Sequence, residues 1–324
     1  MTDVLVPYSP ESLGALDGLS VHVWDGQDDE NVDPGGATDA GALDRVDENS
    51  LPGQDVLDRI EFYVVPYGFA PEAMTLIERM PRLSTVQTLT AGYEHILPHL
   101  RDGLTLCNAR GVHDASTAEL AVTLTLASLR DIPAFARAQE TGAWAPSWGE
   151  SLADKTVLLV GYGAIGRAIE ARLRPFECDV LPVARTARDG VAGTDALPDL
   201  LGRADVVIVI CPLTDETRGM VDESFLASMR DGALLVNVAR GAIVRTEALT
   251  AEVTSGRLRA ALDVTEPEPL PSEHPLWRAP GVLISPHVGG LSSAFAPRAR
   301  RLVQAQLRRF AAGERLANVV VGPA

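Results

Sequence analysis

The sequence predicts an α/β fold in which short buried strands alternate with helices. Six short apolar runs recur in the second half of the chain, at 157–160, 180–183, 206–210, 233–238, 260–264 and 282–285. They are continuously apolar, which is typical of parallel strands covered by helices on both faces. The first 90 residues alternate strand-like and helical stretches less regularly, and 324 residues exceed the needs of one ordinary core. We therefore expect two doubly wound domains.

The first domain begins with strand-like runs. Strands are expected at 3–7, 19–24, 61–65 and 85–90. Between the second and third of them, residues 26–54 are rich in Asp, Glu, Gly, Asn and Pro. That composition is typical of a solvated acidic loop, and surface disorder is its simplest interpretation.

Helices are expected at 71–80, 116–129 and 293–312. Ser116 and Glu119 have the spacing of a capping box at the start of the second helix. The third helix carries a basic face from Arg298 to Arg309, which is typical of a solvated surface. It lies beyond the regular strand array, so we expect it to return to the first domain.

Composition excludes several classes of function. The net charge of -16 and pI near 4.8 would repel nucleic acid and anionic membranes, so an anionic substrate would need a local cation. The three cysteines, Cys107, Cys178 and Cys211, have no metal-like spacing, and no metal is expected. No signal-peptide pattern and no run of 18 apolar residues occurs, which predicts a cytoplasmic protein outside the membrane.

A glycine-rich turn follows the apolar run at 156–160. It reads Gly161-Tyr162-Gly163-Ala164-Ile165-Gly166 and precedes a helical pattern over 164–173. In a strand–turn–helix context, three such glycines allow a tight turn, backbone approach to a pyrophosphate and close helix packing. A structural turn that merely needs glycine is the alternative, but the flanking strand and helix favour a Rossmann-like dinucleotide site.

The end of the second strand of this domain has no acidic residue for the ribose hydroxyls of NAD. Arg185, Thr186 and Arg188 stand there instead. Guanidinium groups pair well with phosphate, so this loop favours NADP over NAD. An exposed basic loop without a ligand is the alternative.

Three later segments end strands of the same predicted sheet, where a doubly wound fold binds its ligands. They contain Arg240, Glu268 and His287. Reduction of a 2-oxo acid needs a cation for the carboxylate and an acid for the developing alkoxide. A histidine oriented by a carboxylate can serve as that acid.

The motifs GYGAIG, CPLTDETRGM, NVARGAIV, ALDVTEPEPLPSEHPLW and SPHVGG resemble the D-isomer-specific 2-hydroxyacid dehydrogenase family, in particular its glyoxylate and hydroxypyruvate reductases. The resemblance runs from about residue 85 to 290. It implies that Arg240 binds substrate, that His287 is the acid/base and that Glu268 pairs with it, whereas Glu266 falls too early in the pattern.

The resemblance also implies binding residues. Asp263 would contact the nicotinamide carboxamide. The turn Thr90-Ala91-Gly92-Tyr93 would hold the substrate carboxylate, and Tyr67 is a further expected substrate contact. The other expected cofactor contacts are Thr117, Cys211, Pro212, Thr214, Thr217, Ala239 and Gly289.

Departures from the family pattern narrow the substrate. Thr265 replaces a common aromatic residue, which changes packing without an obvious chemical effect. Pro66-Tyr67-Gly68-Phe69 offers no cation where phosphoglycerate-oxidising relatives present an arginine. Glu268 stands where formate dehydrogenases carry Gln. A small unphosphorylated 2-oxo acid is therefore expected.

We expect a substrate domain formed by residues 1–103 and 290–324 and a dinucleotide-binding domain over 104–289, with the active site in the cleft between them. The resemblance implies a homodimer. A dinucleotide-sensing regulatory protein of the corepressor type on the same scaffold is the alternative function, because such proteins keep similar residues.

Overall fold

The computed structural model describes residues 1–24, 51–68 and 71–322. Most of the segment predicted to be an acidic loop, namely residues 26–50 of 26–54, lies outside this range. The chain divides into two compact units, unit 1 formed by Met1–His113 with Ser293–Ala324 and unit 2 by Asp114–Ser292. The sequence predicted the two boundaries after residues 103 and 289, somewhat earlier than the divisions after His113 and Ser292.

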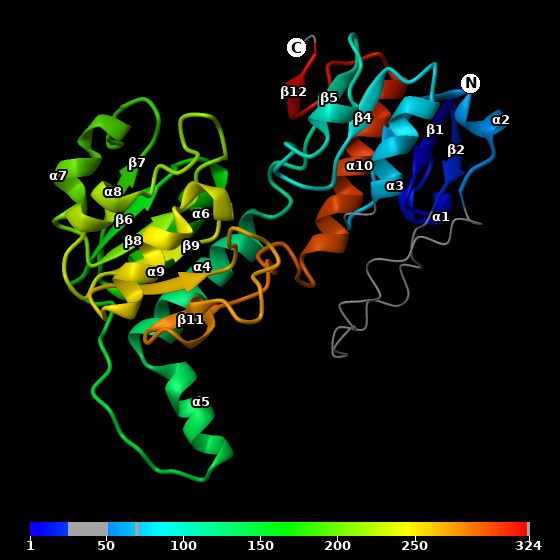
Figure 1. Cartoon of the computed structure of the whole chain (residues 1–324). Helices are drawn as coiled ribbons and strands as arrows, with labels where there is room; N and C mark the ends of the chain where they lie inside the picture. Colours follow the sequence, from blue (N-terminus) through cyan, green and yellow to red (C-terminus); the bar gives the residue numbers. More distant parts are fainter. Residues whose placement is uncertain (25–50, 69–70, 323–324) are drawn as a thin grey trace. The chain divides into compact units, whose positions relative to one another are not determined.

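Unit 1 contains a six-stranded sheet in the order β12-β5-β4-β3-β1-β2 (Figure 1). All neighbours are parallel except the pair β12 and β5. The strands are β1 (Thr2–Val6), β2 (Leu19–Val23), β3 (Ile60–Val64), β4 (Thr85–Gln87), β5 (Thr105–Cys107) and β12 (Val319–Val321). The helical segments are α1 (Pro10–Leu13), α2 (Gln54–Leu57), α3 (Pro71–Thr75), η4 (Leu76–Arg79), η5 (Leu97–His99) and α10 (Phe295–Ala311). This is the doubly wound order 2-1-3-4-5 with one antiparallel strand added at the edge.

Successive residues of the central strands of unit 1 face two separate cores. Leu5 and Tyr63 pack with α3 and η4, whereas Val4 and Phe62 pack with α10. A buried Gln306 fixes α10 further, because its amide donates to Gln87 Oε1 at 2.8 Å. One face of α10 is therefore part of the core of unit 1.

Unit 2 contains a wholly parallel sheet in the order β11-β10-β9-β8-β6-β7. Its strands are β6 (Thr156–Val160), β7 (Asp179–Val183), β8 (Val206–Val209), β9 (Leu234–Asn237), β10 (Arg259–Leu262) and β11 (Val282–Ile284). All six predicted strands are present, and the two sheets confirm the predicted fold class. The strand order reverses at β6, between β7 and β8, and this switch point is where open α/β sheets bind ligands.

The helical segments of unit 2 cover both faces of its sheet (Figure 1). They are α4 (Asp114–Leu129), α5 (Ile132–Glu140), α6 (Ala164–Leu173), η6 (Arg174–Phe176), η7 (Thr194–Ala196), α7 (Leu197–Leu201), α8 (Glu223–Ser228), η8 (Gly241–Ile243), α9 (Thr246–Thr254) and η9 (Pro275–Arg278). The predicted capping box at Ser116 is wrong, because α4 already begins at Asp114. Ser116 lies inside the first turn, and its hydroxyl pairs with that of Ser292 at 2.6 Å. No helix within the described ranges is long and apolar enough to cross a membrane.

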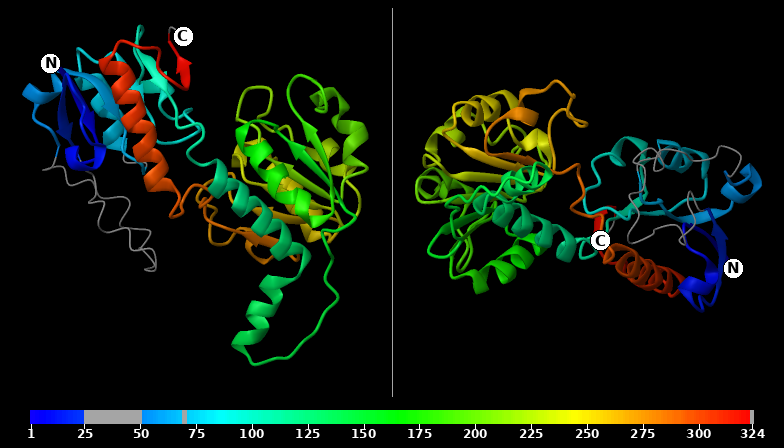
Figure 2. Two further views of the ribbon diagram at one scale, coloured as in Figure 1. Left: turned by 180° about the vertical axis from the view of Figure 1, so that it is seen from behind. Right: turned by 90° about the horizontal axis from the view of Figure 1, so that it is seen from below.

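One segment of unit 2 stands apart from its core. Helix α5 and the chain that returns from it project away from the sheet (Figure 2). Trp144 and Trp148 on the returning chain are fully exposed, and Ile132 of α5 is half exposed. The base of the segment is fixed, because Glu150 forms ion pairs with Lys155 and Arg259.

Candidate active site

The glycine turn lies at the switch point of unit 2, directly after β6. Gly161 has φ +111°, and a Cβ there would lie 2.4 Å from the backbone nitrogen of Cys211, which follows β8. A Cβ on Gly166 would lie 2.4 Å from the carbonyl oxygen of Gly161. Both positions therefore require glycine for the turn itself.

Gly163 differs from the other two glycines of the turn. A Cβ there would have no atom within 4 Å, and its φ is -90°. No side chain caps α6, which begins at the next residue. The open space at Gly163 and the helix N-terminus together suit a pyrophosphate, so the residues present fit a dinucleotide.

An imidazole and a carboxylate meet on two loops that follow β10 and β11. His287 Nδ1 lies 2.5 Å from Glu268 Oε1, and both side chains are partly exposed. The structure brings His287 together with Glu268, the carboxylate that the sequence favoured over Glu266. With Nδ1 engaged by a carboxylate, Nε2 is the nitrogen that can exchange a proton with a ligand.

Asp263 holds the loop of His287 from its buried side. Its carboxylate accepts the N–H groups of Val288 at 2.9 Å and Gly289 at 2.8 Å and the hydroxyl of Ser285 at 2.6 Å. Its carbonyl oxygen accepts the N–H of His287, whose φ of +55° is rare for a residue with a side chain. Such conformations persist only where the surroundings enforce them, and here Asp263 does so.

Arg240 lies on a turn shaped by a buried asparagine at the end of β9. The Asn237 side chain accepts the N–H of Ala239 at 3.1 Å and donates to the carbonyl of Arg240 at 3.0 Å. At Gly241, a Cβ would lie 1.8 Å from the carbonyl oxygen of Thr265. This turn therefore packs directly against the start of the Glu266–Pro269 stretch and fixes the backbone of Arg240.

Other expected cofactor residues line the same end of the sheet in unit 2. Thr217 Oγ1 donates to the carbonyl of Pro212 at 2.7 Å and closes the loop after β8. Thr117 of α4 donates to the carbonyl of Gly289 at 3.1 Å. Burial raises the pKa of the Cys211 thiol to about 11, so this residue is a neutral neighbour of the glycine turn.

The loop after β7 presents the predicted cations. Arg185, Thr186 and Arg188 are all exposed. Arg188 Nη2 donates to the carbonyl of Tyr162 at 2.7 Å, which brings one of the three next to the glycine turn.

The expected carboxylate turn lies in unit 1, after β4. Its carbonyl groups are engaged: Thr88 Oγ1 donates to Thr90, Asn108 Nδ2 to Ala91, and Thr90 Oγ1 to Gly92. The N–H groups of Ala91, Gly92 and Tyr93 donate to no acceptor among the described residues. A turn with fixed carbonyls and available N–H groups is suited to an anion.

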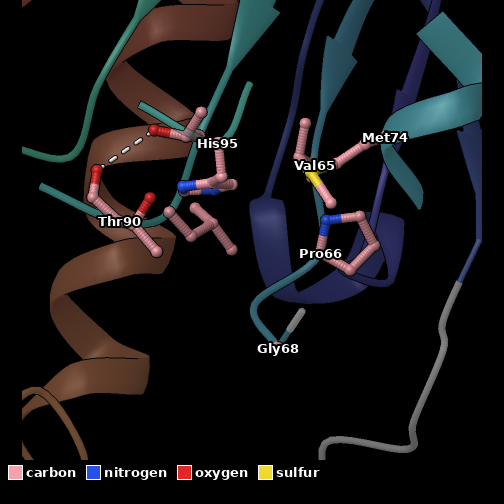
Figure 3. Close-up of a pocket in the computed structure, with 8 residues that line it drawn as sticks. Val65, Pro66, Gly68, Met74, Thr90 and His95 are labelled. Carbon is pink, nitrogen blue, oxygen red and sulfur yellow. Dashed lines mark hydrogen bonds between the residues drawn. The ribbon is translucent and has the colours of Figure 1, made fainter. Parts of the chain in front are cut away.

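A small hollow, partly open to solvent, lies beside this turn at the ends of β3 and β4. Figure 3 shows Thr90 and His95 on one side of it and Val65, Pro66 and Met74 on the other. Tyr67 follows Pro66, and its ring lies 4.2 Å from that of Phe295 and 5.6 Å from that of His113. The hollow therefore combines one apolar wall with one polar wall.

Sequence reasoning assigned no role to several residues that shape these sites. They are Asn108, Glu170, Asn237 and Ser285. A polar residue at the end of an apolar strand was the available signal for Asn237, which is buried. Asn108 and Ser285 lie on loops, whereas Glu170 lies on α6 and accepts a hydrogen bond from the hydroxyl of Tyr162. The sequence has no pattern for these contacts.

The protein is similar to known proteins over most of its length. Residues 122–289 match the family model described as D-isomer specific 2-hydroxyacid dehydrogenase, NAD binding domain. A glyoxylate reductase/hydroxypyruvate reductase of Mus musculus is 35% identical over 64% of this chain and 67% of its own. A glyoxylate reductase of Thermofilum pendens is 34% identical over 74% of this chain and 75% of its own.

The same family is found among solved structures. A D-isomer specific 2-hydroxyacid dehydrogenase from Xanthobacter autotrophicus Py2, in complex with NADPH and MES, has a TM-score of 0.76 and 29% identity. That likeness covers 99% of this chain and 98% of the other.

Proposed function

The chain belongs to the D-isomer specific 2-hydroxyacid dehydrogenase family and is a nicotinamide-dependent oxidoreductase, and from this premise we propose that it reduces a small unphosphorylated 2-oxo acid to the D-2-hydroxy acid. The observation that carries the proposal is the 2.5 Å pair of His287 Nδ1 and Glu268 Oε1, which lies in the same unit as a dinucleotide-type glycine turn and, like that turn, follows strands of its parallel sheet. Glyoxylate and hydroxypyruvate are the first candidates, since relatives at 34–35% identity bear those names.

In the proposed mechanism, His287 donates a proton from Nε2 to the oxygen that becomes the hydroxyl. Glu268 orients the imidazole and stabilises its charged form, as a carboxylate paired with histidine does in other enzymes. Arg240 and the N–H groups of the Gly92 turn hold the substrate carboxylate. When bound, the nicotinamide supplies the hydride. Asp263 maintains the loop that carries His287, with the carboxamide as its proposed ligand.

The hollow in unit 1 supports a substrate without phosphate. None of its described lining residues is Lys or Arg, and a phosphate group would need such a partner. Val65, Pro66 and Met74 form a wall suited to a small carbon substituent. Thr90 and His95 opposite could hydrogen-bond a hydroxyl on it, which supports hydroxypyruvate beside glyoxylate.

For the cofactor we propose NADP in preference to NAD. The loop after β7 has cations where a carboxylate would bind the ribose hydroxyls, and Arg188 lies next to the glycine turn. The similar Xanthobacter protein was solved with NADPH.

A homodimer is the proposed assembly. The projecting segment around α5 carries Trp144 and Trp148, and both side chains are fully exposed. Large apolar side chains on such a segment are typical of a protein–protein contact. In the proposed homodimer, a second copy of the chain contacts this segment.

The deciding experiment is a panel of 2-oxo acids assayed with NADPH and with NADH. We expect turnover of glyoxylate or hydroxypyruvate, a higher kcat/KM with NADPH, and no turnover of a phosphorylated 2-oxo acid. A clear preference for NADH would contradict the cofactor proposal alone. Binding of NADP without turnover of any 2-oxo acid would contradict the enzymatic proposal and favour a dinucleotide-sensing regulator.

A further inference from the structure

Arg188 is exposed, yet its side chain does not extend freely into solvent. Its Nη2 donates to the carbonyl of Tyr162, 26 residues earlier, at 2.7 Å. Its guanidinium carbon also lies 5.8 Å from the centroid of the Tyr162 ring, which is within the range of a cation–π interaction. The second residue of the glycine turn thus contacts this guanidinium through both its backbone and its side chain.

Tyr162 is in turn held by α6. Its hydroxyl donates a hydrogen bond to the carboxylate of Glu170, two turns into that helix. The other oxygen of Glu170 accepts from Arg174 Nη2 at 2.9 Å. The hydrogen bond to Glu170 raises the pKa of Tyr162, so the phenol remains a donor at neutral pH. The ring therefore has a fixed anchor on the helix that follows the glycine turn.

The backbone of Arg188 is also fixed. Arg188 and Val191 exchange both backbone hydrogen bonds, at 3.0 and 2.8 Å, around a tight turn at Asp189 and Gly190. Gly190 has φ +68°, which suits glycine in such a turn. With both its backbone and its guanidinium held, Arg188 loses less freedom on binding a ligand than an unrestrained arginine would.

We propose that Tyr162 and Glu170 are positioning residues, which hold Arg188 where it binds the 2′-phosphate of adenosine and so contribute to cofactor selection. This inference rests on the proposed use of NADP. A guanidinium has five N–H donors, and the bond to the Tyr162 carbonyl uses one of them. The others can form charge-assisted bonds to a phosphate monoester. The preference for the 2′-phosphate then depends on the residue between the first two glycines as well as on the arginine.

Binding is measured by isothermal titration of 2′,5′-ADP and of 5′-AMP, so that the readout does not involve turnover. Arg188→Ala should weaken 2′,5′-ADP by roughly 10- to 150-fold, from about 1.5–3 kcal/mol for hydrogen bonds to a charged group, and leave 5′-AMP unchanged. Arg203→Ala, which removes an exposed cation elsewhere on unit 2, is the charge-matched control.

Tyr162→Leu should weaken 2′,5′-ADP by roughly two- to fivefold, the size of an exposed cation–π contact. Tyr162→Phe and Glu170→Gln should produce part of that loss. The effect must disappear when Arg188 is already alanine, because Tyr162 acts through that side chain. An equal loss for 5′-AMP, or the same loss in the Arg188→Ala background, would show that Tyr162 only shapes the turn and would overturn the inference. If the wild type prefers 2′,5′-ADP and Arg188→Ala leaves both ligands unchanged, the inference is overturned. If the wild type binds 2′,5′-ADP no more tightly than 5′-AMP, the NADP proposal itself fails.

Discussion

Alanine substitutions at Gly161 and Gly163 should separate the two uses of glycine in the pyrophosphate turn. At Gly161 the added methyl would meet the Cys211 backbone at 2.4 Å, and φ is +111°. Overpacking of this kind costs about 1–3 kcal/mol, and a strained φ for a residue with a side chain costs a similar amount. The sum, about 2–6 kcal/mol, is a large part of the 5–15 kcal/mol by which a folded domain is typically stable.

Gly163→Ala should have the opposite effect, with little change in stability but weaker binding of the cofactor. Its methyl meets no atom within 4 Å and its φ is ordinary, so the free energy of unfolding should change by less than about 1 kcal/mol. The same methyl occupies the space through which the backbone approaches a pyrophosphate. An overlap of about 1–3 kcal/mol corresponds to roughly 5- to 150-fold weaker binding of NADP.

Urea unfolding followed by circular dichroism gives the stability of both variants, and isothermal titration with NADP gives the affinity of Gly163→Ala. The reasoning is refuted if Gly161→Ala is as stable as the wild type. It is equally refuted if Gly163→Ala is stable and binds NADP with unchanged affinity.

Three further predictions concern catalysis, pH and assembly. His287→Asn should lower turnover by roughly a hundredfold or more in steady-state assays while NADP affinity is kept, and near-normal turnover would exclude it as the proton donor. The hydrogen bond from His22, at 2.7 Å, lowers the pKa of Asp3, so Asp3 stabilises the fold above its ordinary pKa of 3.8 and this contribution is lost as the pH falls through the lowered value. Asp3→Asn should therefore be less stable than wild type in urea unfolding at neutral pH, with the gap closing in acid; a gap that persists or widens in acid would contradict this. Replacing Trp144 and Trp148 with Ser should shift sedimentation from dimer to monomer, and an unaltered dimer would place the interface elsewhere.

Much of the fold could be predicted because the four central strands of unit 2, β6, β8, β9 and β10, are buried on both faces. Burial on both faces forces continuous apolar runs, which are visible in the sequence. The strands β5 and β12, of three residues each, were not predicted. Strand β4 was expected to reach residue 90, but it ends at Gln87, where the chain begins the turn fixed by Thr88 and Thr90.

The capping error at Ser116 has a similar local cause. Asp114, Ser116 and Thr117 are all residue types that can start a helix, and the choice among them depends on contacts outside the helix. The pairing of Ser116 with Ser292 joins residues 176 positions apart, so local sequence carries no trace of it.

The candidate catalytic residues could be chosen from their motifs, whereas the residues that hold them in place could not. Arg240, Glu268 and His287 lie in motifs with a chemical rationale. Asp263 accepts hydrogen bonds from the loop of His287, and Tyr162 contacts Arg188. Both contacts depend on how segments distant in the sequence meet in space. Such contacts leave no spacing rule in the sequence, which is why positioning residues emerge only from the structure.

The return of α10 and β12 to unit 1 has a consequence for biosynthesis. Unit 2 is one continuous stretch of chain, so all of it emerges from the ribosome before the residues that complete unit 1. Until α10 emerges, the face of unit 1 that includes Val4 and Phe62 lacks the cover of this helix, and its apolar side chains are available for aggregation. Folding during translation should therefore finish with the unit that was begun first, and a chaperone would be needed most in that interval.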